Sequence, residues 1–150
     1  MPKEVFGFKK QLTVGNKGEE LFLRHYKGSE KSDIRKYDLL YKGEKVELKT
    51  DTYPMEKTAN FFMERYGSIE DGKIGGPWRA REDGVKHFVY FYLADKTFFW
   101  FESKALADYL DTYTKDKRGK TVANRGYSSL GFAVPREDLR HLILKEDKVR

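Results

Sequence analysis

One stretch decides the fold: residues 36–51, which read KYDLLYKGEKVELKTD. Apolar and polar side chains alternate on both sides of Lys42-Gly43, and a period of two is typical of strands. A two-residue turn at Lys42-Gly43 would fold the stretch into a hairpin and place Asp38 directly opposite Glu47. The Cβ atoms of residues paired in this way lie about 4.5–5.5 Å apart. Two acids at that separation can share one cation.

The alternation gives the hairpin two chemically different faces. One face is apolar and is expected to join the core, with Tyr37, Leu39, Tyr41, Val46 and Leu48. The other face is mainly charged, with Lys36, Asp38, Leu40, Lys45, Glu47, Lys49 and Asp51. Two alternatives stay open at this point. A three-residue loop with a glycine bulge would shift the pairing by one residue, and the charged face could simply be solvated.

Chain length and composition limit the number of domains, the available metal ligands and the contact with membranes. At 150 residues the chain is expected to form a single domain, residues 1–150. It has no cysteine, so metal ligands must be oxygen atoms or the three histidines, and a hard cation such as Mg²⁺ suits oxygen ligands. The first four residues hold no apolar targeting segment, and no apolar run is long enough to span a bilayer. We therefore expect a soluble, cytoplasmic protein with no membrane partner.

The charge balance favours polyanionic partners. The chain has 30 Lys and Arg residues against 24 Asp and Glu residues, a net charge of +6, and 15% of its residues are aromatic. Cations combined with flat rings are the groups that bind nucleic acid where bases are unpaired or the helix is distorted. The sequence does not support a histidine-based metal site or nucleophile, because the three histidines share no spacing. It does not support nucleotide binding either, because the glycines near residue 75 do not form a phosphate-binding loop.

The rest of the chain predicts an α+β fold of the mixed α/β kind. We expect an extended start at 5–8, a helix over 15–26 with Asn16 as its N-cap, and a glycine-rich loop over 67–77. Strands are expected at 60–66, 87–93, 98–101 and 131–134, and the second of these is expected to be buried on both faces. Helices over 104–113, capped by Ser103, and over 139–144 follow. The sum is a mixed central sheet of about five strands flanked by helices.

The first third of the chain resembles the PD-(D/E)XK nuclease superfamily, which includes restriction endonucleases and archaeal Holliday junction resolvases. The resemblance lies in Asp38 followed by Glu47-Leu48-Lys49 on the adjacent strand, preceded by a helix that bears Glu19 in the context Gly15-Asn16-Lys17-Gly18-Glu19. A second likeness is to phage-type members, in which Lys-Thr-Asp precedes an Asn-x-x-x-Glu strand; here these are Lys49-Thr50-Asp51 and Asn60 with Glu64. It implies a restriction-endonuclease-like core.

The resemblance also implies a metal site and a function. Asp38, Glu47 and the carbonyl of Leu48 would bind Mg²⁺ or Mn²⁺, Glu19 would reach the metal directly or through water, and Lys49 would orient the attacking water. The implied activity is that of a metal-dependent deoxyribonuclease acting on DNA, including structured or branched DNA, with a homodimer by analogy to junction resolvases. The alternative is a catalytically inactive nuclease fold that serves as a nucleic-acid-binding or assembly protein.

Plainer interpretations exist for the acids outside the hairpin. Glu19 and its neighbour Glu20 could be first-turn acids that compensate the helix dipole, and both cannot face the same way because adjacent helical residues point about 100° apart. Glu64 could be a surface acid on a strand.

Two basic segments are candidate nucleic-acid contacts. Trp78 with Arg79 and Arg81 could stack on a base while gripping phosphates, although the Trp78 ring could equally tuck into the core. Non-specific phosphate contact is also the natural use of the basic run that includes Lys117, Arg118 and Lys120, and a solubilising loop would look the same.

Overall fold

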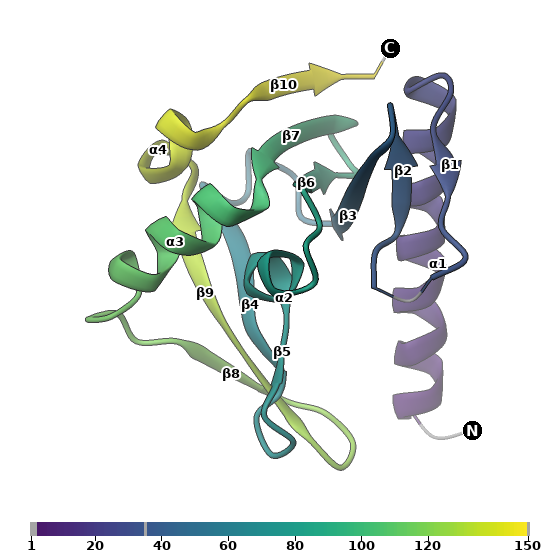
Figure 1. The fold of residues 1–150 in the computed structure, drawn as a ribbon. Coiled ribbons are helices and arrows are strands. Elements are labelled where there is room, and N and C mark those ends of the chain that lie inside the picture. Colours follow the sequence, from purple (N-terminus) through teal and green to yellow (C-terminus); the bar gives the residue numbers. More distant parts are fainter. Residues whose placement is uncertain (1–2, 35, 150) are drawn as a thin grey trace.

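The computed structural model describes residues 3–34 and 36–149, with side chains from residue 13 onward, and arranges them in two sheets and four helices (Figure 1). The helices are α1 (Lys3–His25), α2 (Gly76–Glu82), α3 (Ser103–Tyr113) and α4 (Arg136–Leu139), the last followed by a 3-10 turn at Arg140–Leu142. The strands are β1 (Glu30–Lys31), β2 (Leu39–Tyr41), β3 (Glu44–Asp51), β4 (Asn60–Ser68), β5 (Lys73–Ile74), β6 (His87–Tyr92), β7 (Thr97–Glu102), β8 (Lys120–Ala123), β9 (Ser128–Pro135) and β10 (Lys145–Lys148). The mixed α+β class predicted from the sequence is confirmed.

The hairpin forms in the register that the sequence predicts. Leu39 pairs with Val46 and Tyr41 pairs with Glu44, so the turn contains the two residues Lys42 and Gly43. Both have positive φ, 52° and 76°, as a type I′ turn requires. The alternative of a three-residue loop with a shifted register is therefore wrong.

Six strands form a central mixed sheet in the order β1-β2-β3-β6-β7-β10. β3 and β6 are parallel, whereas the other neighbouring pairs are antiparallel. Parallel neighbours need a long connection, and here residues 52–86 supply it with β4, β5 and α2. β4 and β5 belong to a second, antiparallel sheet in the order β5-β4-β9-β8. The connection therefore lies over the charged side of β3.

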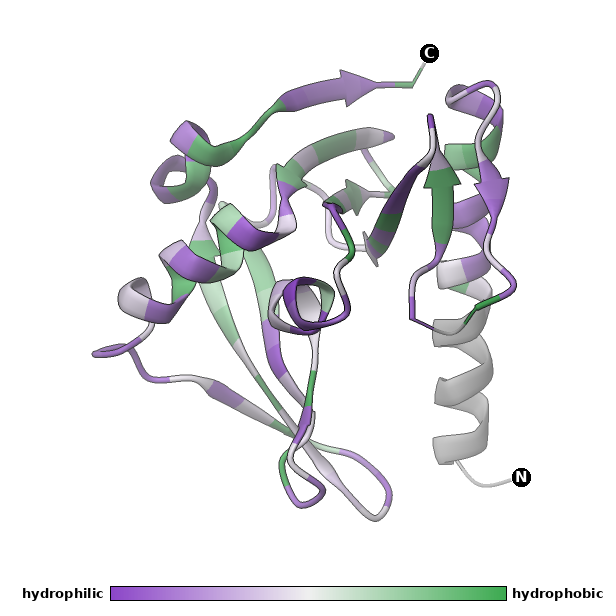
Figure 2. Ribbon diagram, in the orientation of Figure 1, coloured by the Kyte–Doolittle hydropathy of each residue, from purple (hydrophilic) through white to green (hydrophobic). Residues whose placement is uncertain are grey.

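Two apolar clusters cover the two faces of the central sheet. Alternate residues of β6 explain this, because Val89 and Phe91 belong to one cluster and Phe88, Tyr90 and Tyr92 to the other. α1 covers the first cluster, while α2, α3 and the second sheet cover the second one. Figure 2 shows β6 and β7 as mainly hydrophobic and the edge strand β10 as hydrophilic. The predicted central strand at 87–93 is thus confirmed as buried on both faces.

The first helix differs from the prediction. It begins at Lys3, so residues 5–8 are helical and Asn16 lies inside the helix and is not its N-cap. Gly18, which also lies inside the helix, has a packing role, because a Cβ there would overlap Oγ1 of Thr50 on β3. Gly18 thus lets α1 approach β3 closely, a contact that the local sequence pattern does not reveal.

Further differences concern caps and short polar elements. Ser103 is the first buried residue of α3 and makes no side-chain cap, because Glu102 occupies the N-cap position. The glycine-rich loop over 67–77 contains β5 and the first residues of α2. The helix predicted over 139–144 is confirmed in part, because α4 and the 3-10 turn run from Arg136 to Leu142, and β10 begins after it at Lys145. β1 and β8 are short and exposed. Among the described residues, no helix combines the length and apolar character needed to cross a membrane.

Candidate active site

Asp38 lies directly before β2 begins, and there its side chain forms a hydrogen bond that the main chain of a longer strand would form. Its N–H donates to the carbonyl of Val46 at 3.0 Å, and its Oδ2 accepts from the N–H of Leu48 at 2.8 Å. In a continued ladder the N–H of Leu48 would donate to the carbonyl of Tyr37 instead. The carboxylate of Asp38 is therefore fixed at the edge of β3, beside Glu47 and Leu48.

The side chains of Asp38 and Glu47 lie close enough to interact. Burial and the charge of Asp38 raise the pKa of Glu47 well above its usual range, and the Arg79 guanidinium offsets part of this effect. The negative charge of Glu47 is therefore disfavoured in the metal-free protein, and a cation bound beside it would relieve this penalty.

The carbonyl of Leu48 points to the same side of β3 as this pair. The N–H and C=O of one residue lie on the same edge of a strand, and the Leu48 N–H bonds Asp38. The carbonyl therefore supplies a third oxygen on that edge, in the position that the sequence assigns to it.

Glu19 approaches the pair from α1. Burial and the charge of Asp38 raise its pKa, while Lys31, whose Nζ is 3.5 Å from Oε2 of Glu19, acts in the opposite direction. Its neighbour Glu20 is exposed. Both acids lie in the C-terminal half of α1, so the interpretation as first-turn acids is wrong for both. Helix geometry directs Glu19, and not Glu20, toward the hairpin.

Asp38, Glu47, the carbonyl of Leu48 and Glu19 are the candidate metal ligands. Within residues 3–34 and 36–149, no three His, Asp or Glu side chains come together as a group that could hold a metal. Mg²⁺, however, is usually held by one or two carboxylates, with waters and substrate phosphate as its other ligands. Asp38, Glu47 and the carbonyl of Leu48 meet that requirement, with Glu19 outside the direct set.

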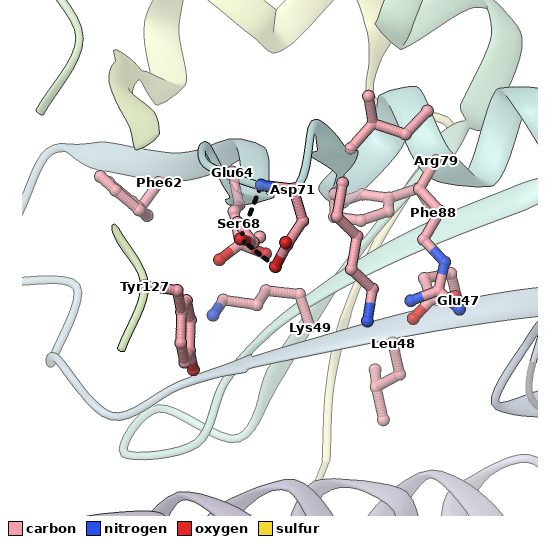
Figure 3. Close-up of a pocket in the computed structure, with 15 residues that line it drawn as sticks. Glu47, Leu48, Lys49, Phe62, Glu64, Ser68, Asp71, Arg79, Phe88 and Tyr127 are labelled. Atoms are coloured by element: carbon pink, nitrogen blue, oxygen red, sulfur yellow. Dashed lines mark hydrogen bonds between the residues drawn. The ribbon is translucent and has the colours of Figure 1, made fainter. Parts of the chain in front are cut away.

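A cleft of about 550 Å³ opens beside Glu47. Its lining combines acids with three basic side chains, those of Lys49, Lys73 and Arg79. Figure 3 shows the guanidinium of Arg79 beside Glu47, whereas the side chain of Lys49 extends the other way, toward Tyr127. Lys49 therefore shares the face of Glu47, as the alternation predicts, but its ammonium group lies along the cleft and not next to that carboxylate.

Glu64 also faces this cleft, from β4 (Figure 3). The start of α2 packs directly on it: a Cβ at Gly75 would lie 2.8 Å from Oε2 of Glu64, and one at Gly76 would lie 2.6 Å from its carbonyl oxygen. Gly76 also has a φ of 52°. The two glycines therefore bring α2, and with it Arg79, over the cleft.

Trp78 and Arg81 both attach α2 to α3. Trp78 is 1% exposed and its Nε1 donates to Asp111 at 2.8 Å, so the prediction that its ring stacks on a base is wrong. Arg81 pairs with Asp108 at 2.8 Å and Asp111 at 2.7 Å, and its contact with a phosphate stays a prediction.

The basic run lies elsewhere. Lys117 and Arg118 are exposed in the loop between α3 and β8, Lys120 opens β8, and Lys117 lies over the ring of Tyr113 at 5.0 Å. Figure 1 places this loop far from β3. These three residues are therefore outside the cleft. The cleft instead uses Lys73 and Tyr127, which the sequence did not single out because no spacing links them to the hairpin.

Comparison of the chain with models of protein families, with curated proteins and with solved structures found no match. The case for the site therefore rests on its geometry.

Proposed function

We propose that the protein is a metal-dependent nuclease that hydrolyses phosphodiester bonds in DNA. The observation that carries the proposal is the close pair of Asp38 and Glu47, because Glu47 lines a cleft that also holds Lys49, Lys73 and Arg79. An acidic pair alone would repel a phosphate. A divalent cation on the pair would reverse that repulsion, and its preferred ligands are the oxygen atoms found here.

Each residue of the site would have its own role in phosphodiester hydrolysis. A bound Mg²⁺ would polarise the phosphate and lower the pKa of an attacking water. Asp38, Glu47 and the carbonyl of Leu48 would hold the ion. Arg79, beside Glu47, is placed to neutralise charge that develops on the phosphate oxygens. Lys49 lines the same cleft and would bind a neighbouring phosphate or orient the water.

The arrangement of elements supports the same proposal. A helix bearing Glu19 packs on an antiparallel hairpin bearing Asp38 and Glu47, and the second hairpin strand continues into a mixed sheet. This order agrees with a restriction-endonuclease-like core. The order of elements is thus a second support for the proposal, beside the pair of acids.

The test is cleavage of labelled duplex, single-stranded and four-way-junction DNA in Mg²⁺ or Mn²⁺. Asp38→Asn and Glu47→Gln should each lower the rate by at least about 100-fold, because each removes a group that holds transition-state charge in place. Lys117→Ala, an exposed cation outside the cleft, is the matched control and should cleave at the wild-type rate.

Unchanged cleavage in both acid variants would contradict the proposal. Salt-sensitive DNA binding without divalent-dependent cleavage would instead select the alternative of a non-catalytic DNA-binding protein.

A further inference from the structure

A second hollow, of about 610 Å³, adjoins the cleft. The two are lined in common by Leu48, Lys49, Phe62, Glu64, Gly67 and Tyr127. They are therefore parts of one groove, which crosses β3 and β4. Glu47 and Arg79 lie in its first part, and Tyr53 and Val122 lie in its second part.

The second part of the groove is rich in exposed apolar surface. Tyr53, Tyr127 and Val122 line it and are 68%, 43% and 40% exposed. Side chains of this size gathered around one hollow mark a binding surface more often than single exposed residues do. Asn124 and Ser129 add hydrogen-bonding groups beside the rings. Flat rings next to amide and hydroxyl groups suit a nucleobase, which offers a π-face and a polar edge.

The main chain holds both tyrosines in place. Tyr127 lies in the turn between β8 and β9, where its carbonyl accepts from the N–H of Asn124 at 2.8 Å. The next residue, Ser128, is attached to the β4–β5 loop through Ile69 and through Oε2 of Glu70, both at 2.8 Å. The N–H of Tyr53 donates to Oδ1 of Asp51 at 2.8 Å. Rings on a fixed main chain lose little freedom when they stack on a base.

We propose that the groove binds an unpaired strand, with bases stacked on Tyr127 and Tyr53 and a phosphate placed at Asp38 and Glu47. Lys49, which lines both parts, would bind the phosphate between them. The inference rests on the proposed function for the role of that phosphate. It names the substrate class as DNA with an unpaired strand next to the cleavage site, since bases inside a duplex are stacked and cannot reach the rings.

The experiment measures binding without cleavage. Fluorescence anisotropy in EDTA would compare a labelled oligo(dT) of about 12 nucleotides, a length within the usual range of single-strand sites, with a blunt duplex of equal length. Tyr127→Ala and Tyr53→Ala should each weaken oligo(dT) binding by about tenfold, the usual loss for one stacked base, with little effect on the duplex. Tyr127→Phe keeps the ring and should bind as the wild type does. Leu144→Ala, which alters an exposed apolar residue outside the groove, should also have no effect.

An oligo(rU) of the same length shows which sugar the groove accepts, because RNA offers the same unpaired bases. Tyrosine-dependent binding of oligo(dT) supports the inference, whereas tyrosine-dependent binding of oligo(rU) alone overturns the assignment of DNA as the substrate. Wild-type affinity for both oligomers in both alanine variants overturns it, as does an equal loss for the duplex. Tyrosine-dependent binding without Mg²⁺-dependent cleavage would refute the nuclease proposal alone. Asp38-dependent cleavage with tyrosine-independent binding would refute the inference alone.

Discussion

Glu47 ionises less readily than an ordinary glutamate, because burial and the negative charge of Asp38 both oppose its charge. The nearby Arg79 compensates only in part. A carboxyl group in this state binds a proton tightly when no metal is present, and it would release that proton to a cation. The same side chain thus costs stability in the metal-free protein and, under the proposed function, would contribute to the affinity for a metal.

The raised pKa of Glu47 predicts how stability depends on pH. The folded protein holds the proton more tightly than the unfolded chain, so metal-free stability should fall as pH rises above about 4.3, the usual glutamate pKa. Glu47→Gln should remove this fall and gain at least about 1 kcal/mol at pH 8, or about 2–4 °C in Tm. Thermal unfolding in EDTA from pH 5 to pH 8 measures it.

The matched control is Glu20→Gln, an exposed acid on α1, which should keep the wild-type pH profile. Parallel profiles for the wild type and Glu47→Gln would show that Glu47 is an ordinary surface acid.

Single residues of the hairpin were predictable because their neighbours are close in sequence. A two-residue turn fixes which residues face each other, and the pairing of Leu39 with Val46 follows by counting. Trp78 and Arg81 were not predictable, since their partners Asp108 and Asp111 lie on another helix. A tryptophan followed by two arginines looks the same in sequence whether its ring is buried or exposed.

Among the elements, the contact of α1 with β3 does most to place Glu19. It depends on Gly18, whose missing side chain leaves room for Thr50. Rotation of the Thr50 side chain would not remove the crowding, because its Cβ does not move on rotation and would lie 3.1 Å from a new Cβ. The glycine therefore sets the distance between helix and sheet.

Gly18→Ala should destabilise the fold despite the higher helix propensity of alanine. Overpacking costs about 1–3 kcal/mol, whereas the propensity gain is at most about 1 kcal/mol. Gly15→Ala is the control, since a Cβ there meets nothing within 4 Å and should be neutral or stabilising. Urea unfolding of the two variants measures the difference. Equal stability of both would contradict the close contact.

Elements were predictable where their pattern is strong. β6 and β7 are nearly continuous apolar runs, and such runs read as buried strands. β5, β8 and β10 are short and mostly polar at sheet edges, so their pairing comes from the tertiary fold. The true start of α1 was missed because glycine signals an end of a helix more often than a packing contact.

In the molecule as a whole, the first and last elements are joined across the central sheet. The hydroxyl of Tyr26 on α1 donates to Oδ2 of Asp147 on β10 at 2.7 Å. The same hydroxyl accepts from Nε1 of Trp100 at 2.8 Å. This buried group holds the edge strand β10 and the helix α1 on the same sheet.

Tyr26→Phe should therefore lower stability by about 1–3 kcal/mol, because it leaves the buried donor of Trp100 without its partner. A loss of about 2–4 °C in Tm per kcal/mol is expected for a chain of this size. Tyr53→Phe, which removes a hydroxyl from an exposed ring, should leave Tm unchanged. Equal melting temperatures for the wild type and Tyr26→Phe would show that the contact is not stabilising.

The groove itself could not be predicted from the sequence. It combines β3 with β4, the start of α2 and the turn before β9, segments brought together by the connection between parallel strands. The acidic pair, in contrast, is local and could be named in advance.

The proposed function requires that Asp38 and Glu47 share a divalent cation. A crystal grown in Mn²⁺ tests this most directly through the anomalous scattering of the metal. A peak should lie in contact with both carboxylates and the carbonyl of Leu48, and it should be absent from Asp38→Asn. A wild-type crystal grown at millimolar Mn²⁺ with no peak between the oxygens of the two carboxylates would refute the proposed function.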